Sequence, residues 1–314
     1  MNILYLSELN PFVCNGGGEI ILRGLLNRGI EEFGHDIVVR TASDDQFNTI
    51  GIIKDADLII CADCFNEPNK QPRTWFSDTV ISSLWGTNYI TCATGHSDWC
   101  NKDYTIPCFG EKDKIGICED CPRNNSLIGK FLASAKLNVF LSPLQKQTAE
   151  DIMQMKFVSR EGNDKSYILC PEIEKDMFYD MGLERDIDYI ICGVICEAKG
   201  YYEICDMIEK NGWQDKNVQW IGDSLVGKVK YGTHVPKIPR EEMPKFMNRA
   251  KHIFGLSVWP EAWGLVYGES LLCNCELIHN DRIGMLSCFK NDSRIAKAEL
   301  SKYKKYYTEF WKKI

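Results

Sequence analysis

The chain has 314 residues, of which 44% are hydrophobic and 26% charged, and its formal net charge is −7. This length favours two α/β-sized domains over one. The acidic balance argues against a protein whose whole surface binds nucleic acid, and no apolar run approaches the roughly 20 residues that span a bilayer. The N-terminus (1–8) has no basic segment and resembles a buried strand. We therefore expect no signal peptide and a cytoplasmic location.

Strand and helix signals alternate along the first half of the chain. Short runs rich in β-branched residues predict strands at 3–6, 35–39, 56–60, 89–93 and 137–141. Apolar residues at helical spacing predict helices at 20–33 and 143–155. Such alternation is typical of a mainly parallel sheet covered by helices.

A second alternating series follows the polar stretch 159–165, which we interpret as the domain junction. It predicts strands at 189–192, 218–221, 252–256 and 276–278, and helices at 201–210, 241–251 and 268–272. The expected fold class is α/β, with Rossmann-like domains over 1–160 and 166–290 whose strand edges face a cleft. The N-terminal domain would carry a Cys-rich insertion at 99–125.

The closing segment, 291–314, predicts an amphipathic helix. Residues 294–314 contain seven Lys or Arg and two Glu, which gives +5 there and leaves −12 on the rest of the chain. Aromatic residues spaced by three and four favour a helix packed back on the body of the protein. The alternative is contact with an anionic membrane surface or polymer, so a peripheral membrane location stays open.

Two loops have features that suit phosphate binding. Gly16, Gly17 and Gly18 lie between the first strand and the first helix, where bare backbone and helix N–H groups can approach an anion. The G-x-G-x-x-G spacing is absent, and a purely structural glycine turn explains the loop nearly as well. Lys199 stands at the corresponding place in the second domain, where an ordinary surface lysine is the alternative.

Two carboxylates after the strand at 252–256 form a more specific pattern. Glu261 and Glu269 are separated by seven residues, with Gly264 between them at the start of a helix. Glu261, in the loop, could accept hydrogen bonds from hydroxyl groups. Glu269, one turn into the helix, suits a vicinal diol such as ribose.

These residues resemble the signature of GT-B-fold retaining glycosyltransferases of the group called family 4. The E-x7-E motif is matched by Glu261 and Glu269, with a glycine at Gly264. Other similar segments occur in the family's order over residues 1–285: 16–19, 94–99, 141–143, 193–200 and 220–223.

The resemblance implies a role for each matching residue. Two would lie at the reaction centre: Glu261 on the sugar hydroxyls and His96 beside the donor sugar. The donor would also be held by Gly17, Gly18, Lys199, Gly264, Leu265, Val266 and Glu269. Among these, Lys199 would bind the diphosphate and Glu269 the ribose.

The implied reaction moves a sugar from a nucleotide-diphosphate-sugar donor to an acceptor, with retention. The departing phosphate would help to deprotonate the acceptor, so no dedicated carboxylate base is expected. No catalytic metal is expected either, because cationic and N–H groups would stabilise the leaving group electrostatically. The sequence does not select the acceptor among glycans, lipid-linked sugars, small molecules and modified nucleic acid.

One position departs from the family pattern. The family commonly has an arginine where Val194 stands, paired with the lysine on the diphosphate. Either another cation replaces it, with Arg240, Lys237 and Arg23 as candidates, or the leaving group is stabilised less. A non-catalytic or regulatory nucleotide-sugar-binding relative, or a GT-B epimerase, is therefore the alternative function.

Four cysteines, Cys100, Cys108, Cys118 and Cys121, lie within 22 residues, the last two as Cys-x-x-Cys. Thiolates at such spacing can close on a structural zinc and hold an insertion that has no other structure. The gap between the first two is not a standard zinc spacing. Free or disulfide-forming thiols and an iron–sulfur cluster are the alternatives.

Overall fold

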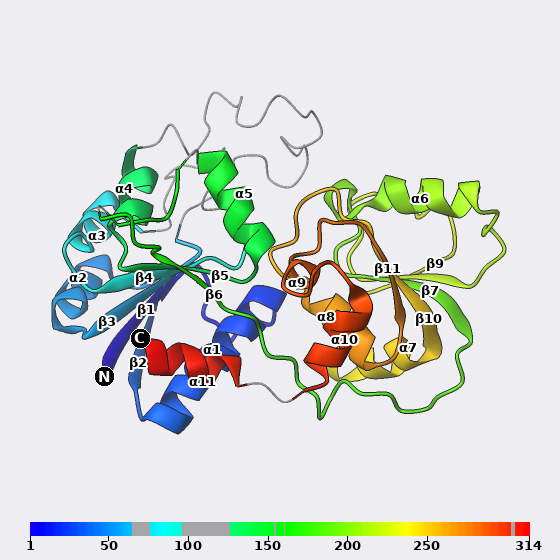
Figure 1. Cartoon of the computed structure of the whole chain (residues 1–314), viewed down its shortest axis with the longest axis horizontal. Helices are drawn as coiled ribbons and strands as arrows, with labels where there is room; N and C mark the ends of the chain where they lie inside the picture. The colour runs from blue at the N-terminus through cyan, green and yellow to red at the C-terminus, as the bar shows by residue number, and fades with distance from the viewer. Residues whose placement is uncertain (65–75, 96–125, 154, 160, 303–304) are drawn as a thin grey trace. The chain divides into compact units, whose positions relative to one another are not determined.

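A computed structural model of the chain describes residues 1–64, 76–95, 126–153, 155–159, 161–302 and 305–314. The chain divides into two compact units (Figure 1). Unit 1 takes the described residues up to Glu172 and then Lys305–Ile314, and unit 2 takes the described residues from Ile173 to 302. Each unit has a parallel sheet with flanking helices, which confirms the expected α/β class.

The sheet of unit 1 has the strand order β2-β1-β3-β4-β5-β6, and every pairing is parallel. Its strands are β1 (Asn2–Ser7), β2 (Asp36–Thr41), β3 (Leu58–Ala62), β4 (Tyr89–Cys92), β5 (Leu137–Phe140) and β6 (Ser166–Ile168). The central strand β3 is buried along its whole length. This explains its continuous apolar sequence, because a parallel sheet is covered on both faces.

Six helices belong to unit 1 within the described residues. They are α1 (Gly17–Phe33), α2 (Gln46–Asp55), α3 (Asp78–Ser83), α4 (Ser126–Ser134), α5 (Pro143–Met153) and α11 (Tyr306–Lys313). Side chains cap two of the short ones, with Asp45 accepting from the N–H of Phe47 and Ser77 from that of Val80. The sequence signals did not predict α2, α3, α4 or β6.

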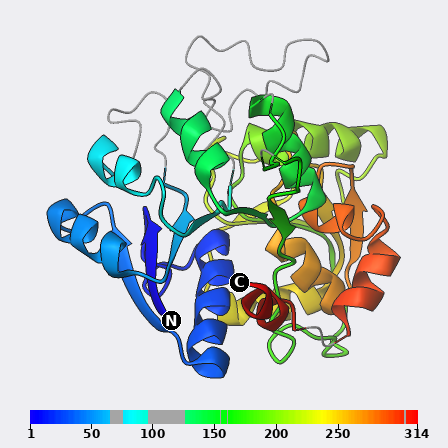
Figure 2. The ribbon, with the colours of Figure 1, turned by 60° about the vertical axis from the view of Figure 1, so that its left-hand side comes forward.

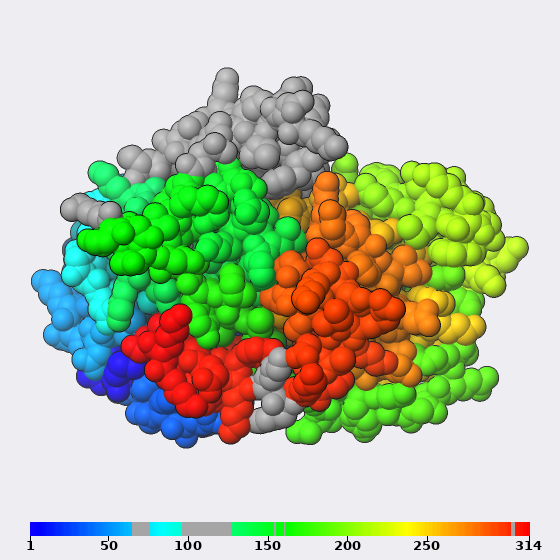
Figure 3. All heavy atoms as spheres, in the orientation of Figure 1, coloured from blue at the N-terminus to red at the C-terminus, as the bar shows by residue number. Residues whose placement is uncertain are grey.

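The last helix, α11, packs against α1 (Figures 2 and 3). Trp311 is buried, and its indole N–H donates to the carbonyl of Leu25 at 2.8 Å. A Cβ on Gly29 would lie 2.7 Å from the indole ring, so the glycine makes room for it. The ring also packs edge-on against His35, with 4.9 Å between the ring centroids. The expected packing of the C-terminal helix is confirmed. The chain forms two helices here, however, α10 (Ser293–Leu300) in unit 2 and α11 in unit 1, where the pattern predicted one.

The sheet of unit 2 has the order β11-β10-β7-β8-β9, again with parallel pairings throughout. Its strands are β7 (Ile187–Cys192), β8 (Val218–Ile221), β9 (Thr233–Val235), β10 (Ala250–Gly255) and β11 (Glu276–His279). The other helices of the unit are α6 (Tyr201–Lys210), α7 (Met243–Arg249), α8 (Leu265–Leu272) and α9 (Gly284–Ser287), with 3-10 turns η3 (Glu197–Lys199) and η4 (Arg240–Glu242).

The polar stretch 159–165 lies inside unit 1. Val158 bridges Asp164 in an antiparallel turn, and β6 follows at once. The boundary between the units falls between Glu172 and Ile173, because β6 completes the first sheet before the chain leaves it. Across the ranges that the structure describes, no helix is both long and apolar enough to cross a membrane.

Candidate functional site

In the sheet of unit 2, the order in which the chain adds strands reverses between β7 and β10, while all strands stay parallel. From β7 the chain proceeds to β8 and β9 on one side, and then crosses to β10 and β11 on the other. Open parallel sheets bind ligands outside the carboxyl ends of the two strands that flank such a switch. The loops after β7 and β10, residues 193–200 and 256–264, are therefore where this sheet predicts a site.

These two loops bring Lys199 and Glu261 together. Lys199 ends η3 in the first loop and Glu261 lies in the second, 62 residues further along the chain. The Lys199 Nζ lies 2.5 Å from Glu261 Oε1. The glutamate side chain is 13% exposed and the lysine side chain 42%, so the cationic side of the pair is open to solvent.

The carbonyl group of Ala198 connects the two loops through hydrogen bonds. The oxygen of Ala198 accepts from the N–H groups of Val258 and Trp259, at 3.0 and 3.2 Å, and from the hydroxyl of Ser257 at 3.0 Å. The same hydroxyl lies 3.4 Å from Glu261 Oε1. The positions of the cation and the carboxylate are thus fixed through backbone contacts and one buried serine, which the sequence reading did not identify.

Two glycines allow the tight turns in these loops. Gly200 has φ +82°, and a Cβ there would lie 2.0 Å from the carbonyl oxygen of Leu256. Gly264 has φ +84°, and a Cβ there would lie 2.5 Å from the ring of Tyr267. Both residues adopt a left-handed conformation that favours glycine, so no side chain is tolerated at either turn without strain.

The helix α8 begins directly after Gly264, and no side chain caps it. The first N–H groups of a helix have no partner within the helix, so those of Leu265 and Val266 are oriented to bind an anion. The positive end of the helix dipole adds to this effect. The backbone donors that the sequence analysis expected here therefore start at the carboxyl edge that carries Lys199 and Glu261.

Glu269 lies one turn into α8 and is only 4% exposed. Its partner is Arg240, the first residue of η4, whose Nη1 lies 2.6 Å from Glu269 Oε1. Burial raises the pKa of the Glu269 carboxyl, and the nearby Arg240 charge opposes this rise. The guanidinium also stacks over the ring of Phe178 at 4.8 Å and lies 3.5 Å from Glu174.

Val194 stands where the family commonly has an arginine, and its side chain is 44% exposed and carries no charge. The three cations that could replace that arginine lie in different surroundings. Arg240 is paired with Glu269, as above. Arg23 donates to Asn15 Oδ1 at 2.9 Å and so holds the loop before the first helix, while Lys237 is exposed.

The sheet of unit 1 has a corresponding switch between β1 and β3. The glycine loop follows β1 at this edge. A Cβ on Gly18 would lie 2.4 Å from the hydroxyl of Thr94, so this glycine is needed for the helix to pack against the loop after β4. A Cβ on Gly17 would meet nothing within 4 Å, so Gly17 presents bare backbone to open space.

Asp63, directly after β3, is a polar group at this edge that the sequence reading missed. Its φ is +46°, which is uncommon for a residue other than glycine. Its carboxylate accepts from the N–H and the hydroxyl of Thr94 at 3.0 and 2.6 Å. Desolvation raises the pKa of this carboxyl, and the negative charge of Glu19 adds to the rise. A lone Asp at the end of a fully buried strand was the available signal.

Several predicted site residues lie outside the described part of the chain. They are His96 and the four cysteines Cys100, Cys108, Cys118 and Cys121. The histidine role and the zinc site stay predictions. Among the residues that the structure does describe, no group of three or more His, Cys, Asp or Glu side chains is arranged to hold a metal ion.

The fold is similar to that of several solved proteins. HepE of Anabaena, in complex with UDP, aligns with a TM-score of 0.63 at 12% identity over 100% of this chain and 99% of that chain. Sucrose-phosphate synthase of Thermosynechococcus elongatus gives 0.57 at 12% identity, over 96% and 88%. An alpha-glucosyltransferase in complex with UDP and a 13-mer DNA gives 0.56 at 10% identity, over 98% and 92%.

Sequence comparison adds no closer relative. No protein-family model matches the chain, and no curated protein matches it. At identities of 12% and below, structural likeness is evidence about the fold. The chain thus has the fold of the GT-B glycosyltransferases.

Proposed function

We propose that the chain is a retaining glycosyltransferase that moves a sugar from a nucleotide-diphosphate-sugar to an acceptor, without a metal at the reaction centre. The observation that carries the proposal is the Lys199–Glu261 pair at the switch between β7 and β10. A sugar diphosphate presents anionic oxygens next to neutral hydroxyl groups. A cation and a carboxylate held side by side match those two parts.

The residues of unit 2 would act mainly through electrostatics. As the glycosidic bond to the phosphate breaks, negative charge grows on the departing diphosphate. The ammonium of Lys199 and the first N–H groups of α8, at Leu265 and Val266, would stabilise that charge. Glu261 would accept hydrogen bonds from hydroxyls of the transferred sugar and so orient its anomeric carbon.

The pair must open when the donor binds. Lys199 Nζ now donates to Glu261 Oε1, and each would exchange this contact for a contact with the donor. The lysine is 42% exposed and reaches solvent, so the exchange requires rotation of a flexible side chain only. Ser257 keeps its contact with the Ala198 carbonyl and would hold the loop while the lysine moves.

Further roles follow from the sequence resemblance. Glu269 would receive the two ribose hydroxyls, and Gly17 and Gly18 would approach the diphosphate. His96 would lie beside the donor sugar and contribute to the reaction centre. Support for a uridine nucleotide comes from the neighbouring structures, since HepE has been solved with UDP-glucose, at a TM-score of 0.54 and 12% identity.

A second candidate function rests on Val194. Its exposed apolar side chain stands where the family commonly has an arginine, so the diphosphate would meet one fewer cation. Loss of one such donor can raise a barrier by about 3–4 kcal/mol. The alternative is a relative that binds the nucleotide-sugar without transferring the sugar.

Donor turnover and donor binding separate the two candidates. We would incubate the protein with a panel of UDP-, GDP- and ADP-sugars, measure slow hydrolysis, and measure affinity by calorimetry. We expect one nucleotide series to bind and turn over, and Lys199→Ala and Glu261→Ala to lower turnover strongly, by about 10²–10³-fold for Lys199→Ala. Binding without turnover would favour the non-catalytic relative, and neither binding nor turnover would refute both.

A further inference from the structure

The buried carboxylate of Glu269 has an environment that differs from that of Glu261. It lies within α8 and is 4% exposed, whereas the Glu261 side chain reaches the open edge of the loop. A carboxylate in such a place is costly to ionise unless a cation is fixed beside it. The charge state of Glu269 therefore depends on what stands next to it.

Arg240 is held next to Glu269 by partners from separate parts of unit 2. Nη1 lies 2.6 Å from Glu269 Oε1, and Nη2 lies 3.5 Å from Glu174 Oε1. The guanidinium carbon lies 4.8 Å from the centre of the Phe178 ring. A planar cation fixed by two acids and one ring has little freedom to leave the carboxylate.

The groups that face Glu269 contain a single cation among the described residues. Glu174 is a like charge and raises the pKa of the Glu269 carboxyl. The thiols of Cys192 and Cys273 are neutral, since burial raises their pKa values. Arg240 thus stands as the counter-charge for two carboxylates.

One hydrogen-bond donor of the Arg240 guanidinium has no partner among the described residues. Its Nε–H is buried and makes no hydrogen bond to any described residue. Buried donors without a partner are rare in packed structure, so this one calls for an explanation.

We infer that Arg240 is a positioning residue for the donor: it keeps the Glu269 carboxylate ionised and oriented to accept the two ribose hydroxyls. This inference rests on the proposed function, because it takes the ribose as the ligand of Glu269. An ionised carboxylate accepts two hydroxyl donors, whereas a protonated one has a hydrogen of its own and accepts fewer. Arg240 acts through Glu269 and needs no contact with the reacting atoms.

The inference gives Arg240 a role different from that of a replacement for the missing arginine at Val194. A diphosphate ligand of Arg240 would require it to leave Glu269 and expose a buried charge. A cation that stays in place and supports Glu269 avoids this cost. The two roles predict different dependence on Glu269, which an experiment can separate.

The test is calorimetric binding of UDP between about pH 6 and pH 8.5 to the wild type, Arg240→Gln, Arg240→Lys, Glu269→Gln and the Arg240→Gln/Glu269→Gln double variant. We expect Arg240→Gln to weaken UDP about 10-fold at neutral pH, with a larger loss at lower pH, where Glu269 becomes protonated. Arg240→Lys should restore most of the affinity and remove the added pH dependence. In the Glu269→Gln background, Arg240→Gln should cause no further loss.

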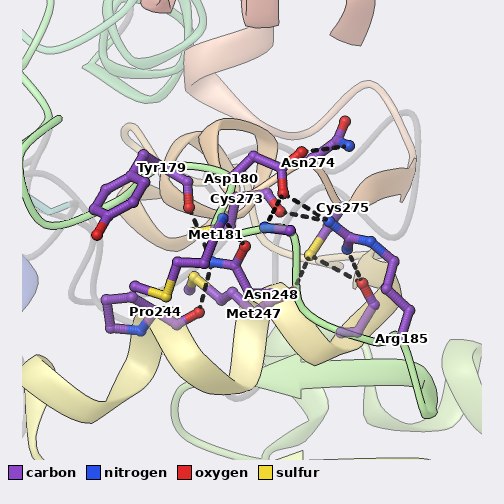
Figure 4. Close-up of polar contacts among 12 residues, drawn as sticks. Tyr179, Asp180, Met181, Arg185, Pro244, Met247, Asn248, Cys273, Asn274 and Cys275 are labelled. Carbon is purple, nitrogen blue, oxygen red and sulfur yellow. Dashed lines mark hydrogen bonds and ion pairs between the residues drawn. The ribbon is translucent and has the colours of Figure 1, made fainter.

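A matched control is Arg185, another arginine of unit 2. Its side chain is 23% exposed, against 22% for Arg240, and it donates to the carbonyls of Ala250 and Cys273 (Figure 4). Figure 4 shows this arginine beside Cys275 and facing backbone oxygens. Arg185→Gln removes structural hydrogen bonds without touching Glu269, so its UDP affinity should follow the wild type at each pH.

A ligand-free measurement keeps the inference testable if UDP does not bind. Removing Arg240 should raise the folded-state pKa of Glu269 further above its unfolded value, so Arg240→Gln should lose stability as pH rises from about 5 to 8. The Arg240→Gln/Glu269→Gln double variant has no titrating carboxyl at this position, so its stability should not fall with pH in this way. Failure of the wild type to bind any nucleotide would refute the proposed function, whereas identical pH profiles for Arg240→Gln and the double variant would refute the role of Arg240. An equal loss of UDP affinity at every pH and in both backgrounds would also refute it.

Discussion

The two units have the same architecture at their carboxyl edges but different chemistry. In unit 2 the switch carries two cation–carboxylate pairs, Lys199–Glu261 and Arg240–Glu269. In unit 1 the described residues at the switch include two acids, Glu19 and Asp63, and Asp63 accepts hydrogen bonds from Thr94. Parallel sheets with a switch determine where a ligand can bind, and the loop side chains determine which ligand it is. Under the proposed function, unit 2 suits a charged sugar diphosphate, and unit 1 offers the bare backbone of Gly17 beside these two acids.

The units also differ in how the end of the chain completes them. The aromatic side of α11 is buried against α1, so unit 1 depends on residues that follow the whole of unit 2. The core of unit 2 under α6 contains residues of unit 2 only. The first prediction tests this difference.

Trp311→Ala should produce the largest effect on stability. Removing a buried indole that also donates to Leu25 should cost about 3–5 kcal/mol. Hydrogen exchange by mass spectrometry should show lost protection in β1 and β2, with β7 and β8 unchanged. The matched control is Trp213→Ala, which removes a ring stacked on Tyr189 at 4.8 Å and should affect unit 2. Equal loss of protection in both units would contradict the assignment of α11 to unit 1.

Lys199→Ala should produce the largest effect on activity. If the proposed function holds, loss of one group that stabilises the leaving diphosphate should lower kcat about 10²–10³-fold, through an effect on the transition state. The control is Lys251→Ala: this lysine is 48% exposed and paired with Asp188 at 2.8 Å, away from the switch. If both variants lose activity alike, the pair after β7 and β10 is not the site.

The sequence predicted most of the strands and singled out Glu261 and Glu269 because both rest on local patterns. Buried parallel strands are continuous apolar runs, which identified β3 and most of β7 directly. The short strands β6 and β9, of three residues each, have too few residues for a periodic signal. The spacing of Glu261 and Glu269 was visible in the chain, but their partners were not.

Partners come from the sheet order, which brings distant residues together. Lys199 meets Glu261 only because β7 and β10 are neighbours in the sheet, although 62 residues separate the two side chains. Arg240 reaches Glu269 from the 3-10 turn η4, which overlaps the predicted helix 241–251, and that prediction gave no sign of the contact. Asp63 was missed because only the contact with Thr94 distinguishes it from other acids after strands.

Gly200→Ala should destabilise unit 2 by about 2–3 kcal/mol. The left-handed φ of +82° costs about 1–2 kcal/mol for a residue with a Cβ, and the clash with the Leu256 carbonyl adds to it. Gly212 is the matched control, with φ +68° and nothing within 4 Å of a Cβ, so Gly212→Ala should cost about 1 kcal/mol. Urea unfolding measures both, and equal losses would mean that the loop can yield at Leu256.

Asp63→Asn should produce the smallest effect, and it is visible mainly as a change with pH. The folded-state pKa of Asp63 is raised above the unfolded value of about 3.8, so the wild type loses stability as pH rises from about 4 through that raised pKa. The asparagine does not titrate, and unit 1 should lose this part of the slope. The substitution also puts an amide nitrogen where an oxygen pairs with the Thr94 hydroxyl, and this exchange costs about 1 kcal/mol.

The comparison of the two edges depends on the sign of that slope. If the edge of unit 1 holds an acid that resists ionisation, the stabilities of Asp63→Asn and the wild type should converge as pH rises, measured by thermal unfolding from about pH 4 to pH 7. Thr94→Val is the control: it keeps the carboxylate and removes the hydroxyl donor, so its slope should become steeper. Parallel profiles for all three proteins would mean that Asp63 is ionised at the same cost in the folded and unfolded chains. The acidic character of this edge would then not distinguish it from the edge of unit 2.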